Sequence, residues 1–220
     1  DVLADYSYDE GGVKHRYGCS GIDGTTIGPV PGAGKDSPSM LMVAYGIYRD
    51  LDRKDNDCQV ILQYDWRKFA DVAKPLSQLA PHHEGLPCDE RYFVYTGNTT
   101  YGVQNLEYDA DTHAYYMAVY PGQKPEFGNF SLFAVDAAVP PRRTPLQGLA
   151  QEGDLLTLAP AAHTDAQGVT GWHYPWGATG LFCAGDGSWY ISREGRDETG
   201  QYGNIHLCRW DGKTPFVEVE

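Results

Sequence analysis

Two acidic residues at equivalent places in the sequence are the first candidates for catalysis. Asp23 and Glu107 each stand six residues after an aromatic residue that precedes glycine, Tyr17 and Tyr101. We expect both carboxylates on inner strands that face one another. One would protonate a leaving oxygen and the other would act as nucleophile or activate water, which is the chemistry of glycosidic cleavage. Because Asp23 precedes Gly24, a role in a tight turn is the alternative for it.

Histidines form the second candidate group. Of the seven histidines, five precede a predicted inner strand. His82, His83 and His163 are candidate metal ligands, and His82 is also a candidate general base. Imidazoles that converge from several loops bind divalent metals or accept protons. The hypothesis is a divalent metal cofactor; the alternative is that each ring caps a turn or bonds a backbone carbonyl.

Aromatic and amide side chains near the same loops are the predicted substrate-binding residues. Flat aromatic faces suit stacking on sugar rings, although aromatic residues also pack between sheets. The predicted residues are Tyr17, Tyr101, Gln104, Asn105, Trp172, Tyr174 and Trp176.

These candidates fall at matching places in three similar stretches. Residues 101–136 form a pattern of three strands separated by turn residues. Matching patterns lie upstream and downstream, so the predicted repeats span about 15–66, 92–136 and 172–212. A recurring unit built of strands predicts repeat architecture. Chance similarity among the short strands of a β-rich chain is the alternative.

The predicted fold is all-β, with residues 1–220 as one domain. Repeats of three or four antiparallel strands favour a β-propeller with three blades, and a β-sandwich is the alternative. Because propellers need roughly four to eight blades, three cannot close a ring. We therefore expect half of a six-bladed ring, completed by a second copy or another chain, unless residues 67–91 and 137–170 supply further blades.

Turn residues and apolar runs predict the individual elements. We expect a turn at Asp23-Gly24, one helical turn within 66–81, and irregular structure around Pro140, Pro141 and Pro145. The predicted strands are 40–48, 58–64, 91–95, 101–108, 114–120, 130–135, 154–158, 188–193, 205–210 and an edge strand in the tail.

An acidic segment lies between the second and third strands of the first repeat. It carries Asp50, Asp52, Asp55 and Asp57 close together. Alternating aspartates resemble a calcium-binding loop, but the glycine and the terminal glutamate of the EF-hand pattern are missing. A solvated hairpin tip is the preferred interpretation.

Composition limits the partners. The 220 residues carry a formal net charge of -13, which repels nucleic acid and anionic membrane surfaces. No apolar run reaches the length of a membrane span, so we expect a soluble protein. The sequence begins at Asp1, so we expect a processed or trimmed chain whose signal peptide would not be visible, and the localisation stays open. The five cysteines lack CxxC spacing, which favours structural thiols over zinc ligands or a disulfide framework.

Five segments resemble an uncharacterised family of bacterial β-propeller-like proteins. The resemblance implies a fold and no particular reaction. The segments are HRYGCSGIDG, VAYGIYRD, RYFVYTGNTTYGVQNLEYD, YMAVYPG and WGATGLFCAGDG.

The predicted function is carbohydrate-related. Some propeller polysaccharide lyases are similar in using axial histidines with a metal, so both hydrolysis and metal-assisted elimination of a glycan or small glycoside are coherent. The alternative is a non-catalytic binding or assembly module of a larger propeller protein. The sequence contains no P-loop, GxSxG, HExxH or dinucleotide fingerprint.

Overall fold

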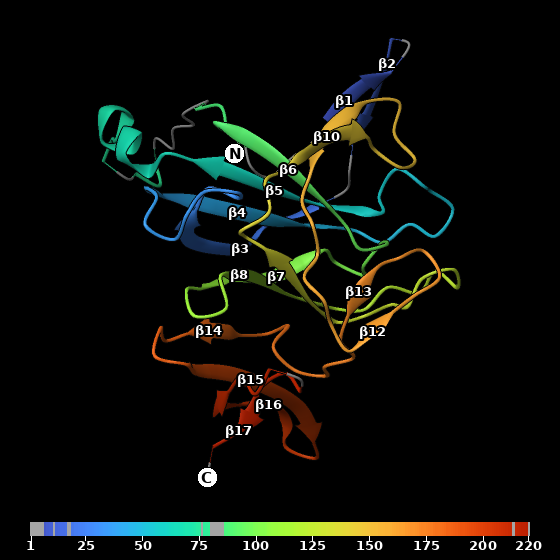
Figure 1. The fold of residues 1–220 in the computed structure, drawn as a ribbon. Helices are drawn as coiled ribbons and strands as arrows, with labels where there is room; N and C mark the ends of the chain where they lie inside the picture. Colours follow the sequence, from blue (N-terminus) through green and yellow to red (C-terminus); the bar gives the residue numbers. More distant parts are fainter. Residues whose placement is uncertain are drawn as a thin grey trace.

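The computed structural model describes residues 7–10, 12–16, 19–75, 77–79, 86–212 and 214–219. Within these residues the chain is all-β, with one short 3₁₀ helix, η1 (Trp66–Val72). Figure 1 shows three sheets stacked face to face, which we call the first, central and last sheets by their order in the chain. None of these sheets closes into a barrel.

The first sheet has six strands in the order β10-β11-β6-β5-β4-β3. Neighbouring strands are antiparallel except for the parallel pair β11 and β6. The bounds are β3 (Cys19–Pro29), β4 (Ser39–Ile47), β5 (Cys58–Tyr64), β6 (Glu90–Tyr95), β10 (Arg142–Pro145) and β11 (Glu152–Leu155).

The central and last sheets are antiparallel throughout. The central sheet consists of β7 (Val103–Asp109), β8 (Ala114–Val119) and β9 (Leu132–Asp136). The last sheet consists of β14 (Leu181–Cys183), β15 (Ser188–Asp197), β16 (Gly200–Arg209) and β17 (Val217–Glu218). Two small hairpins complete the described strands: β1 (Ser7–Glu10) with β2 (Val13–Arg16), and β12 (His163–Thr164) with β13 (Thr170–Gly171).

The central sheet is buried on both faces. Every residue of β8 is buried, and alternate side chains belong to different apolar clusters. Tyr115 and Met117 pack with the first sheet, whereas Tyr116 and Ala118 pack with the last sheet. Because side chains alternate across a strand, an unbroken apolar run is what a strand buried on both faces requires.

Two glycines of β3 allow the first and central sheets to approach closely. A Cβ atom at Gly24 would lie 2.8 Å from the backbone nitrogen of Leu106, and one at Gly28 would lie 2.5 Å from the Tyr115 hydroxyl. The predicted turn at Asp23-Gly24 is therefore wrong. This pair lies inside β3, where the register with β4 shifts between Ile22 and Gly24. Such a bulge bends a strand without ending it.

The other strand predictions are confirmed with shifts of a few residues at their ends. The helical turn predicted within 66–81 is confirmed as η1. The prediction of irregular structure around Pro145 is wrong in part, because Arg142–Pro145 forms β10. This strand is the edge of the first sheet, where a missing backbone N–H breaks no ladder. The four cysteines whose side chains the structure describes are free thiols, and two of them, Cys58 and Cys208, are buried.

The acidic segment 49–57 does not end in a fully solvated tip. Asp57 is buried and accepts a hydrogen bond of 2.5 Å from the Lys124 ammonium, whose side chain is 2% exposed. Lys124 also donates to the Asn56 side chain at 3.1 Å and to the carbonyl oxygen of Arg53. The Lys124 ammonium, and not bulk solvent, therefore satisfies the Asp57 carboxylate at the end of this segment.

The coarse fold prediction, an all-β chain of several antiparallel sheets, is confirmed. A β-sandwich arrangement is compatible with this stack of sheets. In the described part of the chain, no helix has the length and apolar character needed to cross a membrane.

Replacing Lys124 with Met tests the buried ion pair. Lys124→Met should reduce the free energy of unfolding by about 3–5 kcal/mol, because it leaves the buried Asp57 carboxylate without its cation. Adding Asp57→Leu should restore much of that loss. Lys68→Met, which removes an exposed pair with Asp89, is the control and should change stability little. Urea unfolding measures all four proteins; equal losses for Lys124→Met and Lys68→Met would contradict the assignment.

Candidate functional site

Three tyrosines gather where strands of the first and central sheets end. Tyr48 follows β4, Tyr101 precedes β7 and Tyr120 follows β8. The Tyr101 ring meets the Tyr48 ring at a centroid distance of 6.3 Å and the Tyr120 ring at 5.5 Å, both edge to face. Tyr48 is 48% exposed and Tyr101 is 45% exposed. We call these three residues the tyrosine cluster.

Backbone hydrogen bonds join the segments that carry the tyrosine cluster. The Arg49 nitrogen donates to the Thr100 carbonyl oxygen at 3.0 Å, and the Thr100 nitrogen donates to the Tyr120 carbonyl oxygen at 3.1 Å. Each bond involves a cluster residue or its immediate neighbour in the chain. The cluster is thus held by the backbone as well as by ring contacts.

Polar side chains lie beside the tyrosine cluster. The Gln104 amide donates to the Tyr101 carbonyl oxygen at 3.2 Å and to the Asp23 carboxylate at 3.4 Å. Burial raises the pKa of Tyr120, and the nearby Glu194 carboxylate raises it further. Apolar ring faces therefore lie next to amide and carboxylate groups, a combination that suits the apolar faces and hydroxyl groups of sugars.

Glu107 lies on the other side of β7, toward the last sheet. Its side chain is half-buried, and its carboxylate accepts a hydrogen bond from the backbone nitrogen of Cys183 in β14. Burial raises its pKa to about 7. Asn105, on the same side of the strand, donates to the carbonyl oxygens of Gly177 at 2.9 Å and Ala178 at 2.8 Å. A carboxyl group with this pKa is suited to proton transfer near neutral pH.

Asp23 and Glu107 lie on opposite sides of β7. Asp23 is in β3 and is bonded to Gln104, whereas Glu107 faces β14. Asp109, the next acidic residue on the Glu107 side, is buried and accepts three hydrogen bonds from Asp111 and Thr112 in its own turn. The structure thus places Asp23 beside Gln104 near the tyrosine cluster and Glu107 on the opposite side of β7, against β14.

The remaining predicted substrate-binding residues have different surroundings. Trp172 and Tyr174 are buried in the apolar cluster between the central and last sheets, so their rings do not offer a face to a ligand. Trp176 packs at the edge of that cluster, with the Arg193 guanidinium 5.7 Å from its ring centroid. Tyr17 lies outside the described residues.

The predicted metal ligands are described only in part. His82 and His83, including the predicted role of His82 as a base, lie outside the described residues. His163 is exposed in β12, and its ring centroid is 5.4 Å from that of His173. Among the described residues, no group of three or more His, Cys, Asp and Glu side chains is placed to hold a metal ion.

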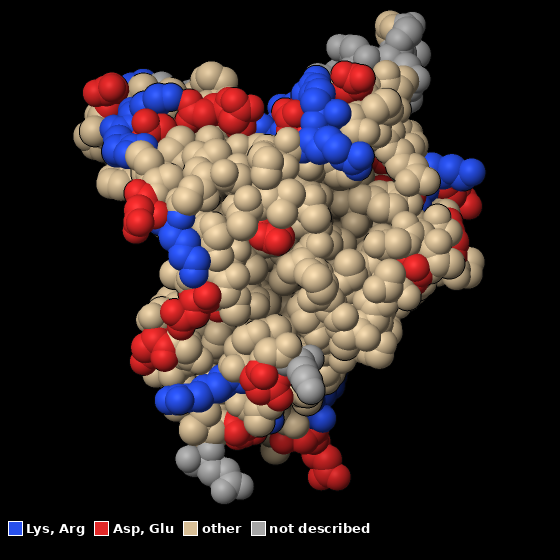
Figure 2. All heavy atoms as spheres, in the orientation of Figure 1, with Lys and Arg blue, Asp and Glu red and all other residues tan. Residues whose placement is uncertain are grey.

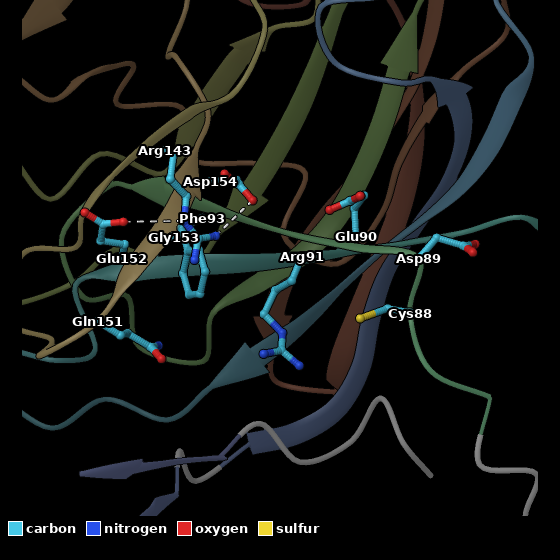
Figure 3. Close-up of a pocket in the computed structure, with 10 residues that line it drawn as sticks. All are labelled: Cys88, Asp89, Glu90, Arg91, Phe93, Arg143, Gln151, Glu152, Gly153 and Asp154. Atoms are coloured by element: carbon cyan, nitrogen blue, oxygen red, sulfur yellow. Dashed lines mark hydrogen bonds and ion pairs between the residues drawn. The ribbon is translucent and has the colours of Figure 1, made fainter. Parts of the chain in front are cut away.

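A polar cavity of about 360 Å³ lies at the other edge of the first sheet, against β6 and β11. Figure 3 shows the Arg143 side chain between Glu152 and Asp154, with Arg91 and Cys88 farther along the wall. Arg143 pairs with Asp154 at 3.2 Å and with Glu152 at 3.8 Å. The lining carries four carboxylates and two guanidinium groups, so its charge does not favour an anion.

The sequence interpretation did not include Tyr48, Tyr120 or Glu194 in the site. A signal was present for the two tyrosines, because each stands at the end of the predicted second strand of its repeat, 40–48 and 114–120. No comparable signal marks Glu194. Its proximity to Tyr120 depends on how the last sheet packs against the central sheet.

Figure 2 shows the charged side chains around the margins of one face, with much of the middle of that face uncharged. Both signs occur in these marginal groups.

No protein-family model, curated protein or solved structure matches the chain.

The pH dependence of folding stability in Glu107→Gln tests whether this carboxyl group is desolvated. Between pH 4.5 and about 7, the folded wild type keeps a proton that the unfolded chain has released, so its stability falls as pH rises through this range. The glutamine side chain does not titrate, so the variant lacks this pH-dependent contribution to stability. Its stability relative to the wild type should therefore increase from pH 4.5 to about pH 7 and then level off.

Urea unfolding of both proteins, at four pH values between about 4 and about 8, measures the difference. Glu126→Gln, at an exposed side chain, is the control for removing one negative charge. A stability difference for Glu107→Gln that is constant with pH would show that the carboxyl group is not held in a desolvated setting.

Proposed function

We propose that this protein binds a neutral carbohydrate at the tyrosine cluster. The observation that carries the proposal is that the Tyr101 ring contacts both the Tyr48 ring and the Tyr120 ring, beside the Gln104 amide and the Asp23 carboxylate. Tyr48 and Tyr101 are exposed, and Tyr120 is half-buried. Exposed apolar groups that lie side by side mark interaction sites, and here two exposed rings and one half-buried ring meet at one place. Ring faces would stack on the sugar, and the amide and carboxylate would bond its hydroxyl groups.

Charge favours a neutral glycan over an acidic one. The chain carries a formal net charge of -13, and Asp23 and Glu194 lie near the tyrosine cluster. An anionic polysaccharide would be repelled by both the local and the overall field. Neutral hexose or pentose polymers, or small neutral glycosides, are the ligand class that fits.

The architecture that we propose for this function is an incomplete β-propeller. Each stacked sheet contains one predicted repeat, with β3-β4-β5, β7-β8-β9 and β14-β15-β16 in the same antiparallel order. Face-to-face packing of successive sheets is the arrangement of neighbouring propeller blades. A second copy or another chain would complete the ring.

Tyr101→Ala tests the binding surface. It should weaken binding of the recognised oligosaccharide by about tenfold, because a ring that contributes a central contact supplies more than about 1 kcal/mol. Isothermal titration calorimetry measures the affinity for a panel of neutral hexasaccharides of the cello-, xylo-, manno- and laminari-oligosaccharide series. Tyr190→Ala is the matched control, since Tyr190 is also 45% exposed but lies on the last sheet.

Equal affinities for Tyr101→Ala and the wild type would contradict the proposed site. Absence of binding to every neutral oligosaccharide, together with binding to a charged one, would contradict the ligand class.

A second candidate function is cleavage of the bound glycan with Glu107 as the proton donor. The specific observation in its favour is the half-buried carboxyl group with a pKa of about 7. An inverting or retaining mechanism needs a second carboxylate across the scissile bond. Asp23, the predicted partner, lies on the other side of β7, so binding without cleavage is the function that the geometry supports better.

Release of new reducing ends from the bound oligosaccharide tests cleavage. If the wild type releases them, Glu107→Gln should lower the rate by about 100-fold or more, because general acid catalysis contributes that much. Glu126→Gln should leave the rate unchanged. An unchanged rate in Glu107→Gln would exclude this carboxyl group as the catalytic acid.

A further inference from the structure

The exposed rings of His163 and His173 form a pair outside the proposed carbohydrate site. His163 is in β12 and is paired across the hairpin with Gly171 of β13, and His173 follows two residues after Gly171. His173 lies beyond the end of β13, and its ring lies beside that of His163, with ring centroids 5.4 Å apart and planes inclined by 49°.

This separation matches the distance between two imidazoles that share one metal ion. A tetrahedral metal about 2.0 Å from one nitrogen of each ring places the ring centroids about 5.2 Å apart. The observed centroid distance of 5.4 Å differs little from that value.

Neighbouring groups hold both rings in place. The buried Phe130 ring is nearly parallel to the His163 ring, at 6.1 Å and 14°, and contacts the His173 ring at 4.9 Å. Backbone contacts fix the chain on both sides of His173. The Ser131 nitrogen donates to the Trp172 carbonyl oxygen at 3.0 Å, and the Tyr174 nitrogen donates to the Ser131 hydroxyl oxygen at 2.8 Å.

We propose that His163 and His173 bind one divalent transition-metal ion, with water completing its coordination. Two imidazole nitrogens suit Cu²⁺, Ni²⁺ and Zn²⁺, with Cu²⁺ bound most tightly, and they do not suit Mg²⁺ or Ca²⁺. The nearby Asp165 carboxylate already accepts hydrogen bonds from the nitrogens of Gly128, Gln167 and Val169. Among the described residues, no third His, Cys, Asp or Glu side chain is placed to complete a metal site, so the two imidazoles are the protein ligands that we propose.

The bound metal would close the β12–β13 hairpin, which lies in the chain between β11 of the first sheet and β14 of the last sheet. His163 lies at the start of this hairpin and His173 just beyond its end, next to the Leu132–Trp172 bridge to β9. An ion that binds the folded state and not the unfolded chain raises the melting temperature. The site thus has a structural consequence that is independent of glycan binding.

Metal titration of the tag-free full chain tests the proposal. His82 and His83 are the one adjacent histidine pair in the sequence, so His82→Ala/His83→Ala is used as the background and removes binding at that pair. In this background, calorimetry should show one equivalent of Cu²⁺ that is lost or weakened at least about tenfold by either His163→Ala or His173→Ala. His206→Ala, at a histidine bonded to Glu218, is the matched control and should keep that equivalent.

Two further measurements do not depend on the single variants. The electron paramagnetic resonance spectrum of the background protein with less than one equivalent of Cu²⁺ should show two imidazole nitrogens on the metal. Zn²⁺ should raise the melting temperature of the background protein, and Mg²⁺ should not. Circular dichroism checks that each variant is folded.

Three results would overturn the proposal. The first is that neither His163→Ala nor His173→Ala changes the metal stoichiometry or affinity. The second is that only one of these two variants has an effect, or that the spectrum shows a single nitrogen. The third is that the His82→Ala/His83→Ala background binds no transition metal, which would make that pair necessary.

Discussion

The structure depends on burial of the central sheet on both faces. Strand β8 places Tyr115, Met117 and Val119 against the first sheet and Tyr116, Ala114 and Ala118 against the last sheet. Exposing either apolar face of this three-stranded sheet to water is unfavourable, so the first and last sheets must cover it. The hydrophobic effect thus sets the order of the stack, and the glycines of β3 set how closely the first two sheets approach.

The loops next to the tyrosine cluster are also closely packed. Lys124 joins the loop after β8 to the segment 49–57, and a side chain at Gly122 would collide with the Asn98 carbonyl oxygen. These closely packed loops follow or precede the three tyrosines in the chain. A charged pair removed from water stabilises little by itself, but it tolerates few alternative arrangements. The three tyrosine rings are therefore carried by closely packed loops, so less conformational entropy of the protein is lost when a ligand binds.

Polar groups on β7 occur where a buried strand would ordinarily be apolar. Asn105 and Asp109 satisfy their hydrogen bonds with neighbouring turns and loops. Glu107 instead has one backbone donor from Cys183 and an environment that disfavours its charged form. Such a carboxyl group reduces stability near neutral pH, and sites of this kind are concentrated where chemistry or binding takes place.

The sequence by itself determined most of the strands and the all-β class, because apolar strand patterns and turn residues such as Gly185-Asp186-Gly187 act locally. It also identified Tyr101 and Glu107 as residues of interest from their places in the repeats. Only the tertiary structure decided that Gly24 lies in a bulged strand, that Trp172 and Tyr174 are buried, and that His163 meets His173. These outcomes depend on which face of one sheet packs on another, and side-chain order along a single strand does not contain that information.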